Sequence, residues 1–232
     1  MEDQNEIIDE RIMKNKIKQS FIDRYFDDDS KEKYEHMLAK KEESAGSLKK
    51  SMIGHLSALN DGVIAIFITV MMLEIPYPRL QTEVKSFLWS IAVFLVSFFI
   101  VAEFWYDNKR IFEAIREADH MVVISNFLFL ASLALIPATT KWIMNQNNRY
   151  SEITFGIVYF ITLMLEQLLY YAAVRERFLN HKALFITILT ARIGYLVIIN
   201  AILMVLAWFY PRPAMLLYLA LPILSFFRPD KG

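Results

Sequence analysis

Long apolar runs dominate the chain after residue 55 and limit the folds that it can adopt. A helix needs about 20 mostly apolar residues to cross a bilayer. Short polar connections separate six candidate segments, at residues 56–75, 87–106, 121–139, 153–174, 184–210 and 213–227. The last segment has only about 15 residues and is the weakest candidate. It is either a short span or a segment joined to the fifth by a tight turn at Pro211, Arg212 and Pro213. The sequence therefore predicts an all-α membrane protein built as a six-helix transmembrane bundle.

Charge is concentrated at the other end of the chain. Residues 1–50 hold 24 of the 50 Asp, Glu, Lys and Arg side chains. Apolar residues recur every four positions over residues 13–25, and the aspartates at 27–29 could cap a second helix at residues 31–43. Residues 44–47, which include Gly46, are typical of a linker. We expect a charged cytosolic helical segment and linker at residues 1–50 and a six-helix transmembrane domain at residues 51–232.

Orientation follows from the basic residues near the ends of the spans. With the N-terminus in the cytoplasm, Lys and Arg on the cytoplasmic side outnumber those on the other side by twelve to five. Cytoplasmic loops carry the excess of Lys and Arg in membrane proteins. We therefore expect both termini to be cytoplasmic, which agrees with an even number of spans.

Composition excludes several classes of protein. The formal net charge is zero, so nothing marks a nucleic-acid partner. The chain has no cysteine, which excludes disulfides, thiolate catalysis and cysteine-based metal sites. Its four histidines are not spaced as metal ligands, and no H-E-x-x-H, G-x-S-x-G or glycine-rich phosphate loop occurs. We expect neither an enzyme nor a bound metal or cofactor.

Polar residues within the predicted spans are costly and invite an explanation. They are Asn60 and Asp61 in the first span, Glu103 in the second, Glu166 and Gln167 in the fourth, and Arg192 and Asn200 in the fifth. Glu74 lies at the outer end of the first span, where we expect an interfacial carboxylate that reaches water. One interpretation is a structural clamp, in which Arg192 and Glu166 pair across helices. The other is a relay for protons or ions.

The first span carries an uncharged stripe. Ile66, Val70 and Leu73 fall within about 60° of one helix face, and Thr69 borders them. Such a stripe is common in ordinary helix packing. If several copies faced a common axis, the same side chains would form stacked hydrophobic rings that can gate a pore by dewetting.

Three motifs resemble a known family. Residues 59–69 read LNDGVIAIFIT, residues 105–112 read WYDNKRIF, and residues 126–130 read NFLFL, with LIP at 135–137. In order and spacing they resemble the R-x-x-x-F-S-D-[GA]-x-x-[AS]-I-x-x-T, W-x-x-H-H-R-L-F and N-x-L-x-L…L-x-P motifs of the transmembrane protein 175 family, which comprises endolysosomal potassium channels and their bacterial and archaeal relatives. The departures are His55 for Arg, Leu59 and Asn60 for Phe and Ser, and Asn108 and Lys109 for the His pair. The resemblance implies that these positions belong to a polar cluster that braces the first helix.

The resemblance implies a passive, potassium-permeable channel, with potassium as the permeating ion. A single six-helix unit implies a homotetramer in which the first helices of four subunits line the pore. The single-repeat form also implies a prokaryotic plasma membrane. Ile66 would form the hydrophobic constriction, with Val70 and Leu73 as further rings and Thr69 as a nearby hydroxyl. The signature and helix-bracing positions would be His55, Leu59, Asn60, Asp61, Gly62, Trp105, Arg110 and Asn126.

Two alternatives stay open. A proton-coupled transporter or proton channel would use Asp61, Glu103, Glu166 or Arg192 as a relay. A membrane scaffold would use residues 1–48 to bind a cytosolic partner.

Overall fold

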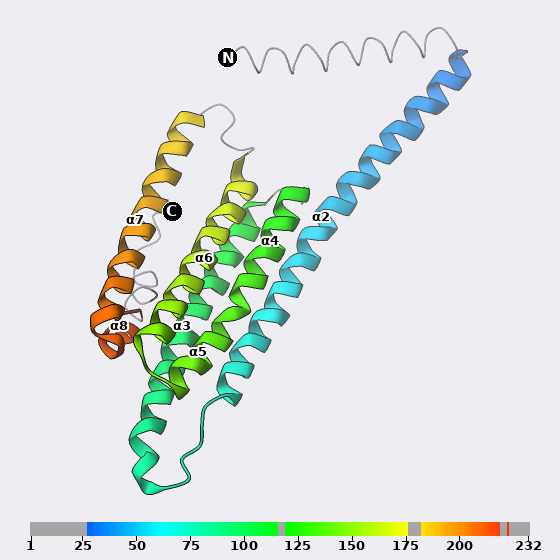
Figure 1. The fold of residues 1–232 in the computed structure, drawn as a ribbon. Helices are drawn as coiled ribbons and strands as arrows, with labels where there is room; N and C mark the ends of the chain where they lie inside the picture. Colours follow the sequence, from blue (N-terminus) through cyan, green and yellow to red (C-terminus); the bar gives the residue numbers. More distant parts are fainter. Residues whose placement is uncertain (1–26, 116–118, 176–181, 219–221, 223–232) are drawn as a thin grey trace. The chain divides into compact units, whose positions relative to one another are not determined.

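The computed structural model describes residues 27–115, 119–175, 182–218 and 222, and the regular elements among them are all helices (Figure 1). The chain divides into two compact units, with the boundary between Lys49 and Lys50. In chain order the elements are α2 (Asp28–Leu73), η1 (Gln81–Glu83), α3 (Val84–Ala114), α4 (His120–Leu133), α5 (Leu135–Asn145), α6 (Arg149–Val174), α7 (Lys182–Phe209) and α8 (Pro211–Tyr218).

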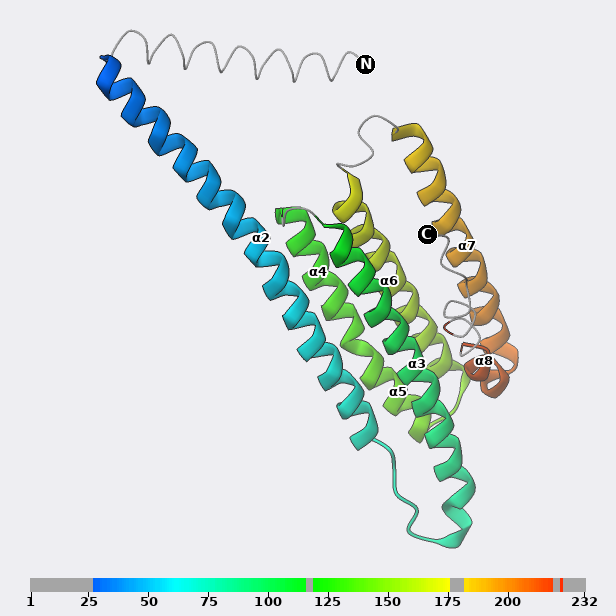
Figure 2. The same cartoon turned by 180° about the vertical axis from the view of Figure 1, so that it is seen from behind.

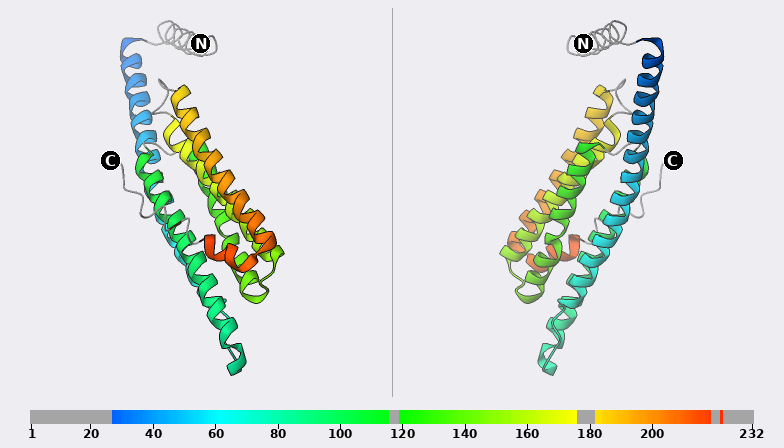
Figure 3. Two further views of the ribbon diagram at one scale, coloured as in Figure 1. Left: turned by 90° about the vertical axis from the view of Figure 1, so that its left-hand side faces the viewer. Right: turned by 90° about the vertical axis from the view of Figure 1, so that its right-hand side faces the viewer.

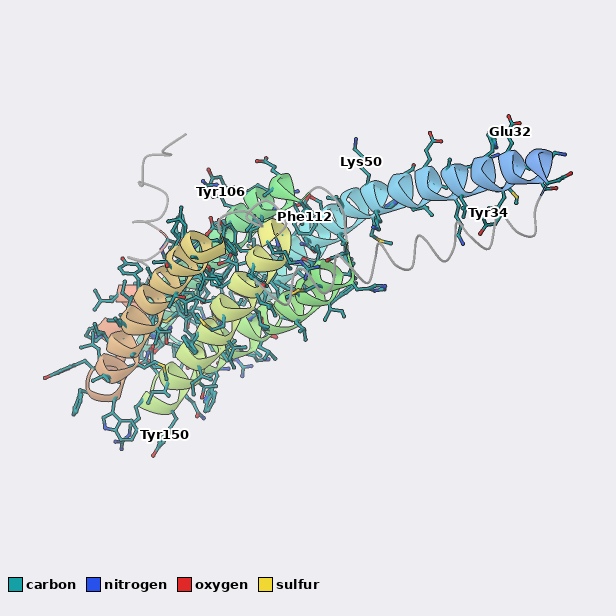
Figure 4. All side chains as sticks on the ribbon, turned by 90° about the horizontal axis from the view of Figure 1, so that it is seen from above. Glu32, Tyr34, Lys50, Tyr106, Phe112 and Tyr150 are labelled. Atoms are coloured by element: carbon teal, nitrogen blue, oxygen red, sulfur yellow. The ribbon has the colours of Figure 1, made fainter. Side chains whose placement is uncertain are left out.

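The start of α2 confirms the predicted aspartate cap. The carboxylate Oδ1 of Asp27 accepts a hydrogen bond from the backbone N–H of Ser30 at 3.0 Å, which satisfies one of the free donors at the helix start. Side chains such as those of Glu32 and Tyr34 project from the first turns that follow (Figure 4). The linker predicted at residues 44–47 is wrong, because these residues are helical within α2. The apolar pattern at residues 13–25 lies outside the described residues.

Within the described residues, five helical stretches are long and apolar enough to cross a membrane: Glu32–Leu73, Gln81–Ala114, His120–Asn145, Arg149–Val174 and Ala183–Phe209. The third consists of α4 and α5, which meet at Ala134. Pro137, one turn further on, has no N–H to donate to the carbonyl of Leu133, so a break in the helix at this point has a local cause.

The sixth predicted span is only partly described. Its first residues belong to α8, which begins at Pro211, so this proline starts a helix rather than forming part of a tight turn. Proline suits the first turn of a helix because its missing N–H would have no partner there. Of the remaining predicted residues, 219–221 and 223–227 lie outside the described part of the chain.

Helix α6 is the centre of the unit that begins at Lys50. It packs against α3, α4, α5, α7 and α8, and Figures 2 and 3 show this bundle of helices from three further sides. Gly156 makes part of this packing possible. A Cβ atom at Gly156 would lie 2.6 Å from the hydroxyl of Tyr218 and 2.9 Å from Cγ of Met204, so the absence of a side chain lets α7 and α8 approach α6.

Polar contacts fix both ends of α6. At its start, the side chain of Asn148 accepts hydrogen bonds from the backbone N–H groups of Tyr150 and Ser151 at 2.9 and 3.0 Å. At its end, Arg175 forms an ion pair with Asp119, which also caps α4. The start of α4 and the end of α6 are therefore connected by Asp119 and Arg175.

Candidate functional site

Asn60 anchors the buried face of α2 to two other helices. Its Nδ2 donates hydrogen bonds to Oδ1 of Asn108 on α3 at 2.8 Å and to Oδ1 of Asn126 on α4 at 2.7 Å. Nδ2 of Asn126 donates back to Oδ1 of Asn60 at 2.9 Å. Asn60 is only 1% exposed, so these bonds form where water does not compete. Three asparagines thus join α2, α3 and α4 at one level.

Asp61 makes a second, more exposed attachment to α3. Its Oδ1 accepts a hydrogen bond from Nε1 of Trp105 at 2.8 Å, and its Oδ2 lies 2.5 Å from Nζ of Lys109. Nζ of Lys109 also donates to the hydroxyl of Ser57 at 3.1 Å, one turn earlier on α2. Lys109 therefore holds two successive turns of α2, and this group and the asparagines restrict the rotation of α2 about its own axis.

The opposite face of α2 is apolar and exposed. Ile66 is 58% exposed and Leu73 83%, and Val70 and Leu59 are exposed as well. Thr69 lies on this face, and its hydroxyl donates to the carbonyl of Ile66 at 2.8 Å. Gly62 is also on this face, and a Cβ there would meet no atom within 4 Å. We call Leu59, Gly62, Ile66, Thr69, Val70 and Leu73 the exposed stripe.

The remaining predicted residues lie at the edges of these groups. His55 is exposed, and because it is eleven residues before Ile66 it shares the side of the exposed stripe and not that of Asn60. The guanidinium of Arg110 lies 5.8 Å from the ring centre of Tyr106, the residue labelled near the end of α3 in Figure 4. Glu74, just after α2, pairs with Lys141 of α5 at 2.7 Å.

The structure also corrects one predicted contact. Arg192 of α7 does not pair with Glu166. Its Nη2 lies 3.8 Å from Oδ2 of Asp107 on α3, and its guanidinium lies 5.3 Å from the ring centre of Tyr170. Asp107 was missed because it follows the apolar core of the second span and does not interrupt it.

Sequence reasoning named Asn60, Asp61, Trp105 and Asn126 as bracing residues, and the structure brings them together in two neighbouring groups. The family resemblance also implied that Asn108 and Lys109 belong to a cluster that braces the first helix, but it did not say which residues they contact, and Ser57 was not named. The signal for Asn108 and Lys109 was that they are the positions at which the second motif departs from its family pattern. Among the residues that the structure describes, no group of three or more His, Asp or Glu side chains could hold a metal ion.

Comparison with known proteins places these residues in context. A family model described as the endosomal/lysosomal potassium channel TMEM175 matches residues 55–137, which contain both polar groups and the exposed stripe. A protein named potassium channel from Chryseobacterium sp. (strain P1-3) is 31% identical over 111 residues, which are 45% of this chain and 56% of that protein. The chain thus spans a little over half of the length of this relative.

Two further similarities come from other organisms. A protein named potassium channel from Chamaesiphon minutus is 29% identical over 148 residues, 58% of this chain and 73% of that one. A protein from Gallus gallus named endosomal/lysosomal proton channel TMEM175 is 26% identical over 112 residues, 45% of this chain and 22% of that one.

The fold has a counterpart among solved structures. The crystal structure of a lysosomal potassium-selective channel TMEM175 homolog from Chamaesiphon minutus superimposes with a TM-score of 0.63 at 21% identity. The match covers 78% of this chain and 99% of that chain. This similarity shows that the helices are arranged as in that fold.

Proposed function

We propose that this chain, whose residues 55–137 match the TMEM175 family model, belongs to that family and forms a potassium-permeable channel. In this proposal four copies assemble around a pore lined by the exposed stripe of α2, and ions pass down their electrochemical gradient. The relatives from Chryseobacterium and Chamaesiphon, both named potassium channels, support the choice of ion.

The observation that carries the proposal is the contrast between the two faces of α2. One face is bound to α3 and α4 through Asn60 and Asp61, so α2 cannot easily rotate. The other face presents Ile66, Val70 and Leu73 without partners among the described residues of this chain. A helix that is fixed in this way presents the same uncharged surface in every copy, as a pore lining requires.

Two residues of the exposed stripe favour a helix partner over lipid. Gly62 does not serve packing within the described part of the chain, because a Cβ there would meet open space. Glycine on a membrane helix lets another helix approach closely. Thr69 adds a hydroxyl oxygen that keeps its acceptor capacity after donating to Ile66. Both features suit an interface around an axis better than a surface covered by acyl chains.

A pore built from these side chains would work without a ring of backbone carbonyls. The T-V-G-Y-G sequence that supplies such carbonyls does not occur in the chain. Rings of Ile66, then Val70 and Leu73 toward the outside, would instead control passage through their width and the cost of removing water from the ion. We assign the constriction to Ile66, because it is the large side chain of the stripe closest to the middle of the span.

The proposal includes a location. Both termini lie in the cytoplasm and the channel lies in a prokaryotic plasma membrane, consistent with the distribution of Lys and Arg and with the bacterial relatives. Residues 1–50 form a charged cytosolic segment, and residues 51–232 form the channel domain.

Flux from liposomes tests this function. The purified full chain is reconstituted into potassium-loaded liposomes with an outward gradient, and flux is followed with and without a protonophore, then repeated with sodium. A channel gives electrogenic potassium flux that the protonophore accelerates by compensating charge, and protein-free liposomes give none. Absence of flux from folded tetramer, or potassium movement coupled to protons in a fixed ratio, would contradict the proposal.

A further inference from the structure

A second polar group lies away from the exposed stripe, among α3, α6 and α7. Glu166 of α6 is 3% exposed and Gln167 is 2% exposed. Nε2 of Gln167 donates to Oε2 of Glu166 at 3.4 Å. Within the described part of the chain, Oε1 of Glu166 and Oε1 of Gln167 have no hydrogen-bond partner. Two neighbouring buried acceptors are therefore left without a donor.

Among the described residues, Glu166 has no ion-pair partner. Within the described residues, no Lys, Arg or His nitrogen lies within ion-pair distance of its carboxyl group, and the nearby Arg192 is within 4 Å of Asp107 instead. The charged groups that act on Glu166 across the helix contacts are Asp107 and Glu103 of α3 and Arg192 of α7. The carboxyl group of Glu166 is therefore buried without an ion-pair partner among the described residues, which is costly for a charged carboxylate.

We propose that Glu166 and Gln167 form a proton-binding site in the core of each subunit, separate from the pore-lining face of α2. A proton on Oε1 of Glu166 would turn an unpartnered acceptor into a donor, and Oε1 of Gln167 on the neighbouring residue is a buried acceptor that lacks one. Since Nε2 of Gln167 already donates to Oε2 of Glu166, a rotation of the two end groups would let the protonated acid donate to the amide in return. A single proton thus removes a buried charge and supplies the missing donor.

A metal cation is the competing occupant, and the structure favours the proton. Potassium or sodium would need several oxygen ligands in place of its water. Glu166 and Gln167 offer two unpartnered oxygens. Asn200, a buried amide on α7, has an unpartnered Nδ2 donor and not an unpartnered oxygen, so it adds no ligand. One proton meets the need of both oxygens.

Infrared spectroscopy of the full chain in lipid tests this site directly. At neutral pH the wild type is expected to show the carbonyl stretch of a protonated carboxylic acid. Because the acid is buried, its proton should exchange slowly for deuterium when the protein is placed in deuterium oxide. Glu166→Gln removes this component. Glu113→Gln, the same substitution at an exposed position of α3, leaves it unchanged. Gln167→Leu keeps the acid but shifts the band, because the amide partner is lost.

The variants also separate this signal from that of Glu152, another buried carboxyl with an unpartnered oxygen. Glu152→Gln removes a different component and leaves that of Glu166. If Glu166→Gln does not fold, the shift in Gln167→Leu still identifies the band. Absence of an acid band that responds to Glu166 or Gln167 overturns the proposal, and stabilisation by added potassium or sodium that Glu166→Gln abolishes would assign the site to a cation instead.

Proton linkage gives a second measurement. In this proposal the folded protein holds a proton at Glu166 that the unfolded chain releases to water. Over the pH range in which only the folded state keeps this proton, the free energy of unfolding falls as pH rises. The melting temperature of the wild type in detergent should therefore decline toward alkaline pH more steeply than that of Glu166→Gln. Equal slopes in the two proteins would contradict a proton bound at this position.

Discussion

Helices α2 and α7 expose similar apolar side chains but differ in how they are held. Ile66 of α2 is 58% exposed and Ile198 of α7 is 61% exposed. The membrane-spanning part of α2 is tied to α3 and α4 by Asn60 and Asp61, whereas the ion pair described for α7 is the 3.8 Å contact of Arg192. Exposure alone therefore does not distinguish the two helices, and the polar anchor on the opposite face of α2 is the difference on which the proposed pore lining depends.

Cysteine accessibility separates the two helices most strongly. The chain has no cysteine of its own, so single cysteines can be added without a background. We expect a charged, membrane-impermeant thiol reagent to abolish potassium flux through Val70→Cys and Leu73→Cys, because these side chains would line water. Flux through Ile198→Cys should be unchanged, because that side chain would face lipid.

The wild type treated with the same reagent is the control for effects on the lipid or on lysines. Equal block at Val70→Cys and Ile198→Cys, or none at either, would remove the distinction between α2 and α7.

Loss of the asparagine group should have the next largest effect. Asn60→Leu leaves the buried Asn108 and Asn126 without their shared partner, which costs about 1–3 kcal/mol for unsatisfied buried groups. We expect a lower melting temperature and a broader distribution of conductance, because α2 is then free to rotate. The matched control is Thr69→Val on the exposed face of the same helix, where the lost hydrogen bond is local to α2. A melting temperature for Asn60→Leu as high as that of Thr69→Val would show that Asn60 does not anchor the helix.

The pair of Asp61 and Lys109 should contribute less, because both side chains are partly exposed. A double-mutant cycle with Asp61→Asn and Lys109→Gln is expected to give a coupling of about 0.2–1 kcal/mol. Thermal unfolding of the two single variants, the double variant and the wild type measures it. Additive effects would mean that the contact at 2.5 Å adds no stability.

The smallest effect is expected on α7. Arg192→Gln removes a long, half-exposed contact with Asp107, and we expect a loss of no more than about 0.5 kcal/mol with little change in flux. The same thermal measurement applies. A loss as large as that of Asn60→Leu would show that α7 is anchored as firmly as α2, and the comparison on which the pore assignment depends would fail.

Periodicity and composition predicted much of this architecture. Apolar run length located the five spans that the structure describes, because crossing a bilayer imposes a length that is visible in one sequence. The stripe of Ile66, Val70 and Leu73 was visible for a similar reason, since helical spacing assigns residues to a face.

The contacts across helices could not be predicted in the same way. Spacing along α2 places Asn60 on a face but does not say that Asn108 and Asn126 lie opposite, because that depends on the relative heights of three helices. The sequence does not show these relative heights, so Arg192 was paired with Glu166, whereas in the structure its guanidinium lies within 4 Å of Asp107. The linker predicted at residues 44–47 was wrong because neighbouring Glu, Lys and Leu residues favour helix strongly enough to outweigh Gly46.

The most direct test of a pore lined by α2 compares Ile66→Asn with Ile198→Asn in the same liposome assay. Both substitutions place an amide at a similarly exposed isoleucine in a membrane-spanning helix. If Ile66 forms the constriction, Ile66→Asn wets it and raises potassium flux severalfold or weakens the preference for potassium over sodium, whereas Ile198→Asn leaves both unchanged. Unchanged flux and selectivity in folded Ile66→Asn, or the same change in both variants, would contradict the account.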